Sequence, residues 1–408
     1  MVAGDSRIGT ASPSGARSPI LEQMAPALTM THLRQARMSS MLLDVAVDRT
    51  PMSVARWFGA QQAQDVASGH WSLGARCTGL TQSDVTGAFE RAEIVRTWPM
   101  RGTIHIIPAE DLQWMLALTG SRTLTGAERR RENLGLTLRD ATTAVNALAL
   151  ELRAKPVLMR SDALACIADA GIEVTGQRGY HLLWYAAQHG VTCIGPQRGT
   201  DQTFVAVAEW APHQVTMTRD EALAELLLRY VRSHGPVSLR DFAGWTGLTM
   251  TDAKRAATGN DGRLIPLAFH GQELWSTVEI AERLRHGDGF GQEPVALPGF
   301  DEFILGYKDR SVQVPDGAME RIVPGGNGVF RATVVIEGLV VATWKRTLAS
   351  TRVTVEIEPL ARMTKAMRAK VDASFAPYAA FLGRNLVVRE SSATALGTCA
   401  APRPGAGA

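Results

Sequence analysis

The chain has 408 residues, 45% of them hydrophobic and 20% charged, a length that predicts two to four modules rather than one simple core. Its net charge of +3 does not by itself indicate a nucleic-acid partner, and no apolar run is long enough to span a membrane. Only six of the 43 basic residues are lysines. Arginine suits bidentate phosphate contacts, although a GC-rich genome produces the same bias.

Both ends of the chain have the composition of disordered segments. Residues 1–29 are rich in Ala, Gly, Ser and Pro and lack the apolar core of a signal peptide, so we expect an N-terminal extension. Residues 391–408 are also of low complexity, and we expect a disordered tail. The four cysteines are far apart without zinc-ligand spacing, which predicts no metal, no cofactor and a reducing, cytoplasmic location.

The first predicted module covers residues 30–120. Helical periodicity runs over residues 32–43 and 54–62, and residues 81–84 supply an N-cap for a further helix. Residues 94–107 alternate around a turn and predict a β-hairpin. Helices followed by a hairpin are the order of a winged helix-turn-helix.

The stretch 121–138 carries several arginines between the first two modules. We assign it to a basic linker, and the alternative, which the charge pattern favours, is the solvated face of a helix. Arg122, Arg129 and Arg130 lie here and are candidate phosphate contacts. Either interpretation places these side chains in solvent.

Two more modules repeat the same order of elements with little residue identity, over residues 139–210 and 211–290. The predicted helices of these modules cover residues 141–153, 161–170, 178–189, 221–233, 238–244 and 251–257. The predicted strands cover residues 191–194, 203–207, 264–269 and 273–278. Arg178 opens a third helix, the place where a helix-turn-helix contacts DNA, whereas Trp184 on the same helix is expected in the core.

From residue 291 to residue 390 the pattern changes to short alternating runs, which predict a small β-barrel or curled sheet. The expected strands cover residues 303–307, 328–336, 340–346, 353–357 and 386–389, with a helix over 360–382. The expected fold class is therefore α+β, with three helix-and-hairpin modules and a β-rich C-terminal region.

The most informative motif is Gln62-Ala63-Gln64-Asp65, which ends an apolar segment. Carboxamides at i and i+2 cannot share a helix face, so if both act at one point the backbone must leave the helix there. Glutamine has no useful pKa, so the pair can orient water and stabilise positive charge but cannot act as a strong base. Such chemistry suits a substrate that is already activated. The alternative is that these are surface or capping residues at a helix end.

Four blocks in this order resemble the AlkZ-like family of bacterial winged-helix DNA glycosylases, related to the YcaQ proteins, over roughly residues 31–390. The blocks are the glutamine motif, MRGTIH at 100–105, LPGFDEFILGYKDR at 297–310, and NGVFR at 327–331 with WKR at 344–346. The YcaQ branch carries Gln-x-Asp, so glutamine at both positions favours the AlkZ-like branch.

The resemblance implies three tandem winged helices bent into a C-shaped basic groove. It implies monofunctional excision of N7-alkylated purines, including bulky antibiotic adducts and interstrand crosslinks, with Gln62 and Gln64 as the catalytic residues. Such a base carries a positive charge and leaves without a general acid, so the glutamine carbonyls need only face the sugar cation and hold a water. We expect a monomer that acts on double-stranded DNA.

The remaining candidates each have a structural alternative. Asp65 either orients a glutamine or caps the next turn, and capping is favoured. Arg101 and His105 share one face of the predicted hairpin and could reach phosphate or the lesion. Asp301 and Tyr307 either border the active cleft or belong to a salt-bridged structural core.

Further candidates for DNA contacts are Arg331 and Lys345 in the β-rich region, beside Arg122, Arg129, Arg130 and Arg178. Two other functions stay open at this point. One is a winged-helix transcription regulator, and the other is a resistance protein that sequesters a drug without catalysis. Three modules in tandem with a β-rich cap favour a monomeric clamp on DNA over a regulator.

Overall fold

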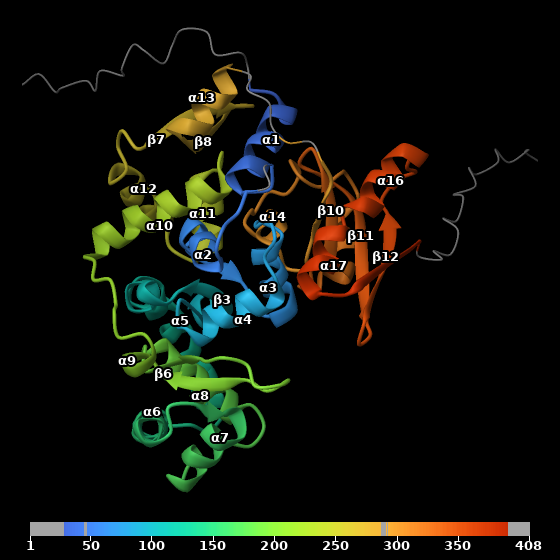
Figure 1. Ribbon diagram of the computed structural model, residues 1–408. Helices are drawn as coiled ribbons and strands as arrows, with labels where there is room; N and C mark the ends of the chain where they lie inside the picture. The colour runs from blue at the N-terminus through green and yellow to red at the C-terminus, as the bar shows by residue number, and fades with distance from the viewer. Residues whose placement is uncertain (1–27, 45–46, 287–290, 292, 391–408) are drawn as a thin grey trace, which may run out of the picture.

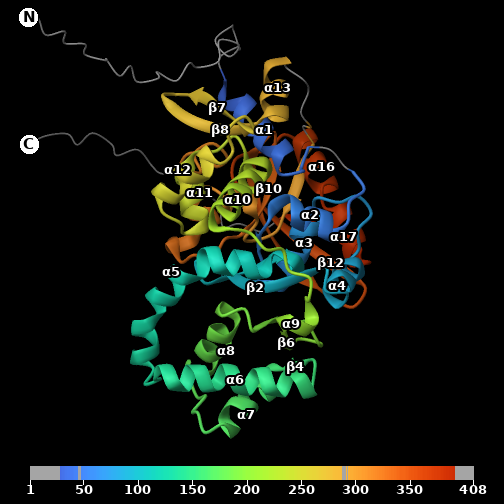
Figure 2. The same ribbon diagram turned by 90° about the vertical axis from the view of Figure 1, so that its left-hand side faces the viewer.

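The computed structural model describes residues 28–44, 47–286, 291 and 293–390. The predicted tail at 391–408, and all of the predicted extension except residues 28 and 29, lie outside this part of the chain. No helix of the described part is long and apolar enough to cross a membrane. Figures 1 and 2 show the helices of the second module, α6 Leu138–Ala154, α7 Arg160–Asp169 and α8 Arg178–Gln188, at one end of the molecule. The hairpin of the third module, β7 Leu264–Phe269 and β8 Gln272–Thr277, lies with α13 Val278–His286 at the other end.

The first module has four helices, a short strand and a hairpin. These elements are α1 Met30–Ser40, α2 Pro51–Phe58, β1 Gln61–Gln62, α3 Val66–Gly74, α4 Gln82–Glu90, β2 Ile94–Met100 and β3 Thr103–Pro108. The N-cap predicted for α4 is confirmed as a capping box between Thr81 and Asp84. The predicted helix over residues 54–62 extends too far. Helix α2 ends at Phe58, because Gly59 has a φ of 78° and terminates it.

The stretch assigned to a basic linker is helical. Helix α5, Leu112–Asn133, runs through most of it, so the alternative of a solvated helix face is the one the structure has. Arg122, Arg129 and Arg130 are all exposed on this helix. The chain then enters the second module almost without a break, because α6 begins at Leu138.

The second and third modules follow the predicted order closely. The second contains α6 Leu138–Ala154, β4 Leu158–Met159, α7 Arg160–Asp169, α8 Arg178–Gln188, β5 Thr192–Ile194, β6 Thr203–Ala206 and α9 Val207–Trp210. The third contains α10 Arg219–His234, α11 Leu239–Thr246, α12 Met250–Thr258, β7 Leu264–Phe269, β8 Gln272–Thr277 and α13 Val278–His286. Their identity as winged helices in a C-shaped arrangement stays a prediction.

The hairpins of the first two modules join into one sheet. Its six strands have the order β1-β3-β2-β5-β6-β4, and β2 meets β5 where Arg96 faces Ile194. The hairpin β7–β8 of the third module forms a separate two-stranded sheet. The second module nevertheless has a core of its own, whereas the first, the third and the C-terminal region share one large core.

The C-terminal region differs from its prediction in three ways. Its sheet is open, with the order β13-β12-β11-β10-β9, so of the two expected forms, a barrel or a curled sheet, the barrel is wrong for the described residues. The expected strand 303–307 is a short helix, α14, because the Asp301 side chain caps its first turn. The expected helix 360–382 is two helices, one ending at Ala373 and the other beginning at Ala376. Pro377 fits the first turn of the second helix but would disrupt the interior of one long helix.

The sheet and its helices cover one side of the first module. These elements are β9 Val295–Leu297, α14 Glu302–Leu305, α15 Met319–Ile322, β10 Ala332–Ile336, β11 Leu339–Leu348, β12 Arg352–Pro359, α16 Lys365–Ala373, α17 Ala376–Leu382 and β13 Asn385–Glu390. Figure 1 shows α17 beside α3, and the rings of Trp71 and Phe381 join them with centroids 5.2 Å apart. The 297–310 block contacts the glutamine motif, because the backbone N–H of Gln62 donates to Glu302 of this block.

Candidate active site

The glutamine motif lies on a strand pairing and not on a helix. Gln61 faces Ile106 and Gln62 faces His105 across β1 and β3, and the Ala63 amide donates to the Ile104 carbonyl at 2.9 Å. Burial alternates as a strand requires, with Gln61 and Ala63 buried. Gln62 is half-buried and Gln64 is exposed. Gln62 therefore lies on the outer face of the ladder, and Gln64 follows it in a bend just beyond β1.

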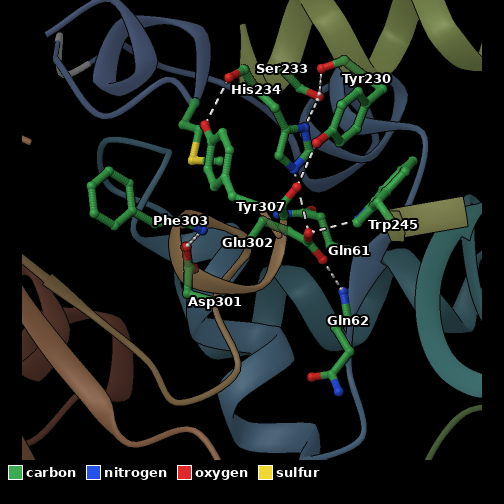
Figure 3. A network of polar contacts seen from close by, with 12 residues as sticks. Gln61, Gln62, Tyr230, Ser233, His234, Trp245, Asp301, Glu302, Phe303 and Tyr307 are labelled. Carbon is green, nitrogen blue, oxygen red and sulfur yellow. Dashed lines mark hydrogen bonds and ion pairs between the residues drawn. The ribbon is translucent and has the colours of Figure 1, made fainter. Parts of the chain in front are cut away.

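The backbone of Gln62 is fixed by a carboxylate from the C-terminal region. Its N–H donates to Oε1 of Glu302 at 2.8 Å. Figure 3 shows the Gln62 side chain pointing away from this carboxylate while its backbone faces it. The side-chain Oε1 is buried without a hydrogen-bond partner in the described part of the chain. A buried carbonyl left in this state costs about 1–3 kcal/mol, which a donor from substrate or water would recover.

Glu302 belongs to a buried polar network behind the ladder. Its Oε2 accepts from the indole N–H of Trp245 at 3.0 Å and lies 3.4 Å from Nε2 of His234. The Nδ1 of that histidine lies 2.8 Å from Oγ of Ser233 (Figure 3). Burial pushes the pKa of the Glu302 carboxyl upward, but the hydrogen bond and charge of His234 outweigh it, so the pKa is lowered. A fixed negative charge therefore stands directly behind Gln62.

His105 shares the face of Gln62 because the two residues are directly opposite in the antiparallel ladder. Its Nδ1 lies 2.8 Å from the Thr103 carbonyl, which requires the proton on Nδ1. The Nε2 is buried and without a partner in the residues that the structure describes. Burial lowers the pKa of His105 to about 4, so the ring is neutral at pH 7 and offers a lone pair. His105 thus lies on β3 of the predicted hairpin, and its place in an active cleft stays a prediction.

Asp301 lies in the structural core. Both of its oxygens bind the guanidinium of Arg76, at 2.8 and 2.9 Å, and both side chains are almost fully buried. It also accepts from Oγ of Ser72 at 3.0 Å and from the amide of Phe303 at 2.9 Å. With these acceptor sites occupied, Asp301 holds α14, and thereby Glu302, in place.

Tyr307 is also structural. Its hydroxyl donates to the His234 carbonyl at 2.7 Å, and the guanidinium of Arg37 stacks over its ring at 4.1 Å. Asp65 caps α3 by accepting from the Ser68 amide at 2.8 Å, as expected. It also lies 3.5 Å from the guanidinium of Arg346.

Arg101 does not lie on the strand face of His105, where the alternation of side chains predicts it. It has a left-handed φ of 51° at the tip of the β2–β3 hairpin, and its Nη1 donates to the Gly244 carbonyl at 3.2 Å. Arg122 donates in the same way to the Gly247 carbonyl at 3.3 Å. Both arginines therefore meet the C-terminal end of α11, where the helix dipole favours positive charge.

The predicted DNA contacts divide into two groups. Arg101, Arg122, Arg129 and Arg130 have no carboxylate partner within the described ranges. Ion pairs hold the others: Arg178 with Glu173 at 3.0 Å, Arg331 with Glu358 at 3.4 Å and Lys345 with Glu356 at 2.9 Å. The arginines without a carboxylate partner lie on the hairpin tip and α5.

Nothing in the described residues suggests a metal centre, because no three His, Cys, Asp or Glu side chains there are grouped as ligands. The arrangement can hold a positively charged group beside two amides, a neutral imidazole and a buried carboxylate. Sequence reasoning did not single out Glu302, His234 or Trp245 as parts of this site, although Glu302 lies in the 297–310 block. Asp301 and Glu302 are adjacent, and only the helix cap shows which carboxylate turns toward Gln62.

Comparison with known proteins places this site in a class of DNA repair enzymes. A model of the family described as DNA glycosylase AlkZ-like matches residues 55–381, and the chain belongs to that family of DNA glycosylases. An interstrand DNA cross-link repair glycosylase from Streptomyces sahachiroi is 26% identical over 332 residues, which cover 76% of this chain and 85% of that protein. The structure of the Streptomyces sahachiroi DNA glycosylase AlkZ matches with a TM-score of 0.74 at 21% identity. That match covers 90% of this chain and 100% of the other, and shows a shared fold.

Proposed function

We propose that this chain hydrolyses the N-glycosidic bond of N7-alkylated purines in double-stranded DNA, with Gln62 and Gln64 as the catalytic residues. The substrates are bulky adducts of the kind antibiotics make, or interstrand crosslinks. The printed name of the Streptomyces sahachiroi relative, which refers to cross-link repair, supports the second class. The acting form is a monomer in the cytoplasm.

The reaction needs no strong acid or base. Alkylation at N7 places a positive charge on the purine, so the bond from C1′ breaks with its electron pair moving to the base, which leaves neutral. The sugar becomes a cation resembling an oxocarbenium ion, and water adds to C1′ and loses a proton. Amide carbonyls beside C1′ stabilise that cation and hold the water in line. A lysine for a covalent step is not required.

One observation carries the proposal: Gln62 is fixed at its backbone and free at its side chain. Glu302 fixes the amide N–H, whereas the carboxamide oxygen has no partner in the described chain. Gln64 follows two residues later in an exposed bend, and its Oε1 accepts from the Ile104 amide at 3.4 Å. One carbonyl without a partner and a second held only by this long contact can both turn toward a cation at the motif.

The experiment is single-turnover release of free base from a duplex with one N7-methylguanine, and from duplexes with bulky N7 adducts. We expect Gln62→Ala and Gln64→Ala each to slow excision by about 10²- to 10³-fold, as loss of one preorganised polar group does elsewhere. Gln82→Ala is the matched control, because Gln82 is exposed on α4.

Two results would contradict different parts of the proposal. Undiminished excision by both alanine variants would remove the glutamines from catalysis. If the wild type releases no base from any N7 adduct, the chemistry itself is wrong. A crosslinked duplex tests the substrate class separately, because unhooking converts it into two strands that denaturing electrophoresis separates.

A further inference from the structure

A cavity of about 270 Å³ lies between the tip of the β2–β3 hairpin, α5 and α8. The hairpin contributes Arg101 and Gly102, and α8 contributes Tyr180, His181 and Trp184. The α5 wall contains Gly126 and Arg130. Pockets for drug-sized ligands measure about 300–1,000 Å³, so this cavity fits one small ring system rather than a whole drug.

Unused hydrogen-bonding groups line this cavity. His181 is 2% exposed, and its buried Nε2 has no partner among the described residues. Trp184 is 6% exposed, and its Nε1 would lie 3.8 Å from a Cβ added at Gly102. The rings of His181 and Trp184 are 5.4 Å apart and tilted by 36°. The half-buried Tyr180 offers an aromatic face in this wall, and the ring nitrogen of His181 offers a hydrogen bond to a planar, polar ring that stacks there.

The charges at the cavity restrict what it can hold. Arg101 and Arg130 border it, and neither has a carboxylate partner within the described ranges. Burial and the nearby Arg130 and Arg131 lower the pKa of His181 to about 4, so this ring adds no charge at pH 7. Two arginines repel the cationic N7-alkylpurine but attract a phosphodiester. The occupant is therefore neutral, aromatic and linked to phosphate.

The position of the cavity relates it to the glutamine motif. Residues along a strand are about 3.4 Å apart, so Gly102 lies about 7 Å from Ile104, whose amide contacts Gln64. Successive bases of B-DNA are also about 3.4 Å apart along one strand. The cavity is thus close enough to the glutamines for both to contact neighbouring nucleotides of one duplex.

We propose that this cavity binds the unstacked neutral base of a nucleotide close to the lesion, with Arg101 and Arg130 on its phosphate. The proposal rests on the proposed function, because it assumes a lesion at the glutamines. Removing this base from the duplex opens the helix beside the adduct without requiring that the adduct itself be flipped. Base stacking on aromatic side chains tolerates any sequence, so the site fits repair at many positions.

Gly126 permits a direct test. It lies in α5 and lines the cavity, and a Cβ added there meets nothing within 4 Å. Gly126→Leu therefore fills the cavity and raises helix propensity, so the thermal midpoint should not fall. Thr125→Leu is the matched control, because it adds the same side chain at the adjacent exposed position, outside the cavity lining.

The measurement is the affinity, at fixed salt, for a duplex with one N7-methylguanine whose sugar is fluorinated to resist cleavage. Each nucleotide within three steps, on either strand, is replaced in turn by an abasic residue. At one position we expect the wild type and Thr125→Leu to lose about 5- to 150-fold in affinity, the range for one stacked base. Gly126→Leu should show this loss already with the intact duplex, and base removal should add nothing.

Three outcomes would overturn the proposal. Base removal could be neutral at every position in the wild type, or its effect could be the same in Gly126→Leu. The leucine variant could also weaken binding only when a bulky aromatic adduct replaces methyl, which would assign the cavity to the adduct. Failure of the proposed function is distinguishable, because excision is measured on the cleavable duplex and affinity on the resistant one.

Discussion

The carboxylate of Glu302 accepts a hydrogen bond from the backbone amide of Gln62 at 2.8 Å, across 240 residues of sequence. This contact joins the C-terminal region to the glutamine motif. Glu302 is buried and faces Gln62 from the interior, so it acts through the strand and we regard it as a positioning residue. The Glu302 carboxylate therefore holds the backbone of Gln62 from one side, while the carboxamide oxygen of Gln62 has no partner in the described chain.

Glu302→Gln should slow excision without weakening DNA binding. The substitution keeps the shape, removes the charge and turns an amide toward the Trp245 N–H, which needs an acceptor. Displacement of Gln62 by about 1 Å can cost about 10²-fold in rate. The check is a single-turnover rate beside an equilibrium affinity, with Glu282→Gln on the exposed face of α13 as control. A loss of affinity with an unchanged rate would assign Glu302 to binding instead.

Asp301→Asn should destabilise the fold. It leaves the Arg76 guanidinium buried without its counter-charge, and breaking a buried pair in this way costs about 3–5 kcal/mol. Urea unfolding followed by tryptophan fluorescence measures the change. Glu110→Gln is the comparison, because its pair with Arg56 is solvent-exposed and should contribute about 0–1 kcal/mol. Equal effects of the two variants would show that Asp301 is not the structural residue described.

Arg129→Ala should lower the salt dependence of DNA binding more than Lys345→Ala does. Each phosphate contact contributes about one unit to the slope of log affinity against log salt. Arg129 has no carboxylate partner in the described chain, whereas Glu356 lies 2.9 Å from the Lys345 ammonium. Titrations between 50 and 200 mM salt, roughly the range over which such contacts are lost, measure the slopes. The reverse order would place the DNA over the C-terminal sheet.

Acid should destabilise the protein through its buried histidines. Burial lowers the pKa of His70 and of His105 from 6.5 to about 4. Between these values the unfolded chain binds protons that the folded chain excludes, so stability is complete above pH 6.5 and falls as the pH decreases toward 4. Each group contributes on the order of 3 kcal/mol by pH 4.

His70 offers the cleaner test of this pH dependence, since it stacks on Phe89 and is not one of the predicted site residues. His70→Gln should flatten the decline of the thermal midpoint between pH 7.5 and pH 5. The exposed His213→Gln serves as control and should retain the wild-type decline. A parallel decline in all three proteins would assign acid sensitivity to other groups.

Local signals in the sequence predict most of the helices. Capping boxes such as Thr218 with Glu221 and Ser238 with Asp241 begin α10 and α11, and such caps involve residues three apart. Hairpins are predicted well because alternation and turns are also local. The helix predicted over 54–62 ended too late, although the glutamine spacing requires the backbone to leave the helix there if both amides act at one point, and β1 does pair with β3.

Some errors come from local caps and breakers whose strength the pattern does not show, and others occur where distant residues decide the structure. The apolar run after Asp301 fits a strand or a short helix, and the cap selects the helix. A barrel and an open sheet have the same strand patterns, and only the pairing of the edge strands distinguishes them. The network of Glu302, His234 and Trp245 joins the C-terminal region to the third module, and no local pattern in the sequence marks it.

The pairing of Gln62 with His105 also governs how the motif can change during evolution. Side chains on a strand alternate, so deletion of one residue between Gly59 and Gln61 would turn Gln62 and Gln64 inward. A change of two residues would keep them outward. When relatives of this protein are aligned, a gap of one residue before the motif therefore marks a lost site, even where both glutamines are retained.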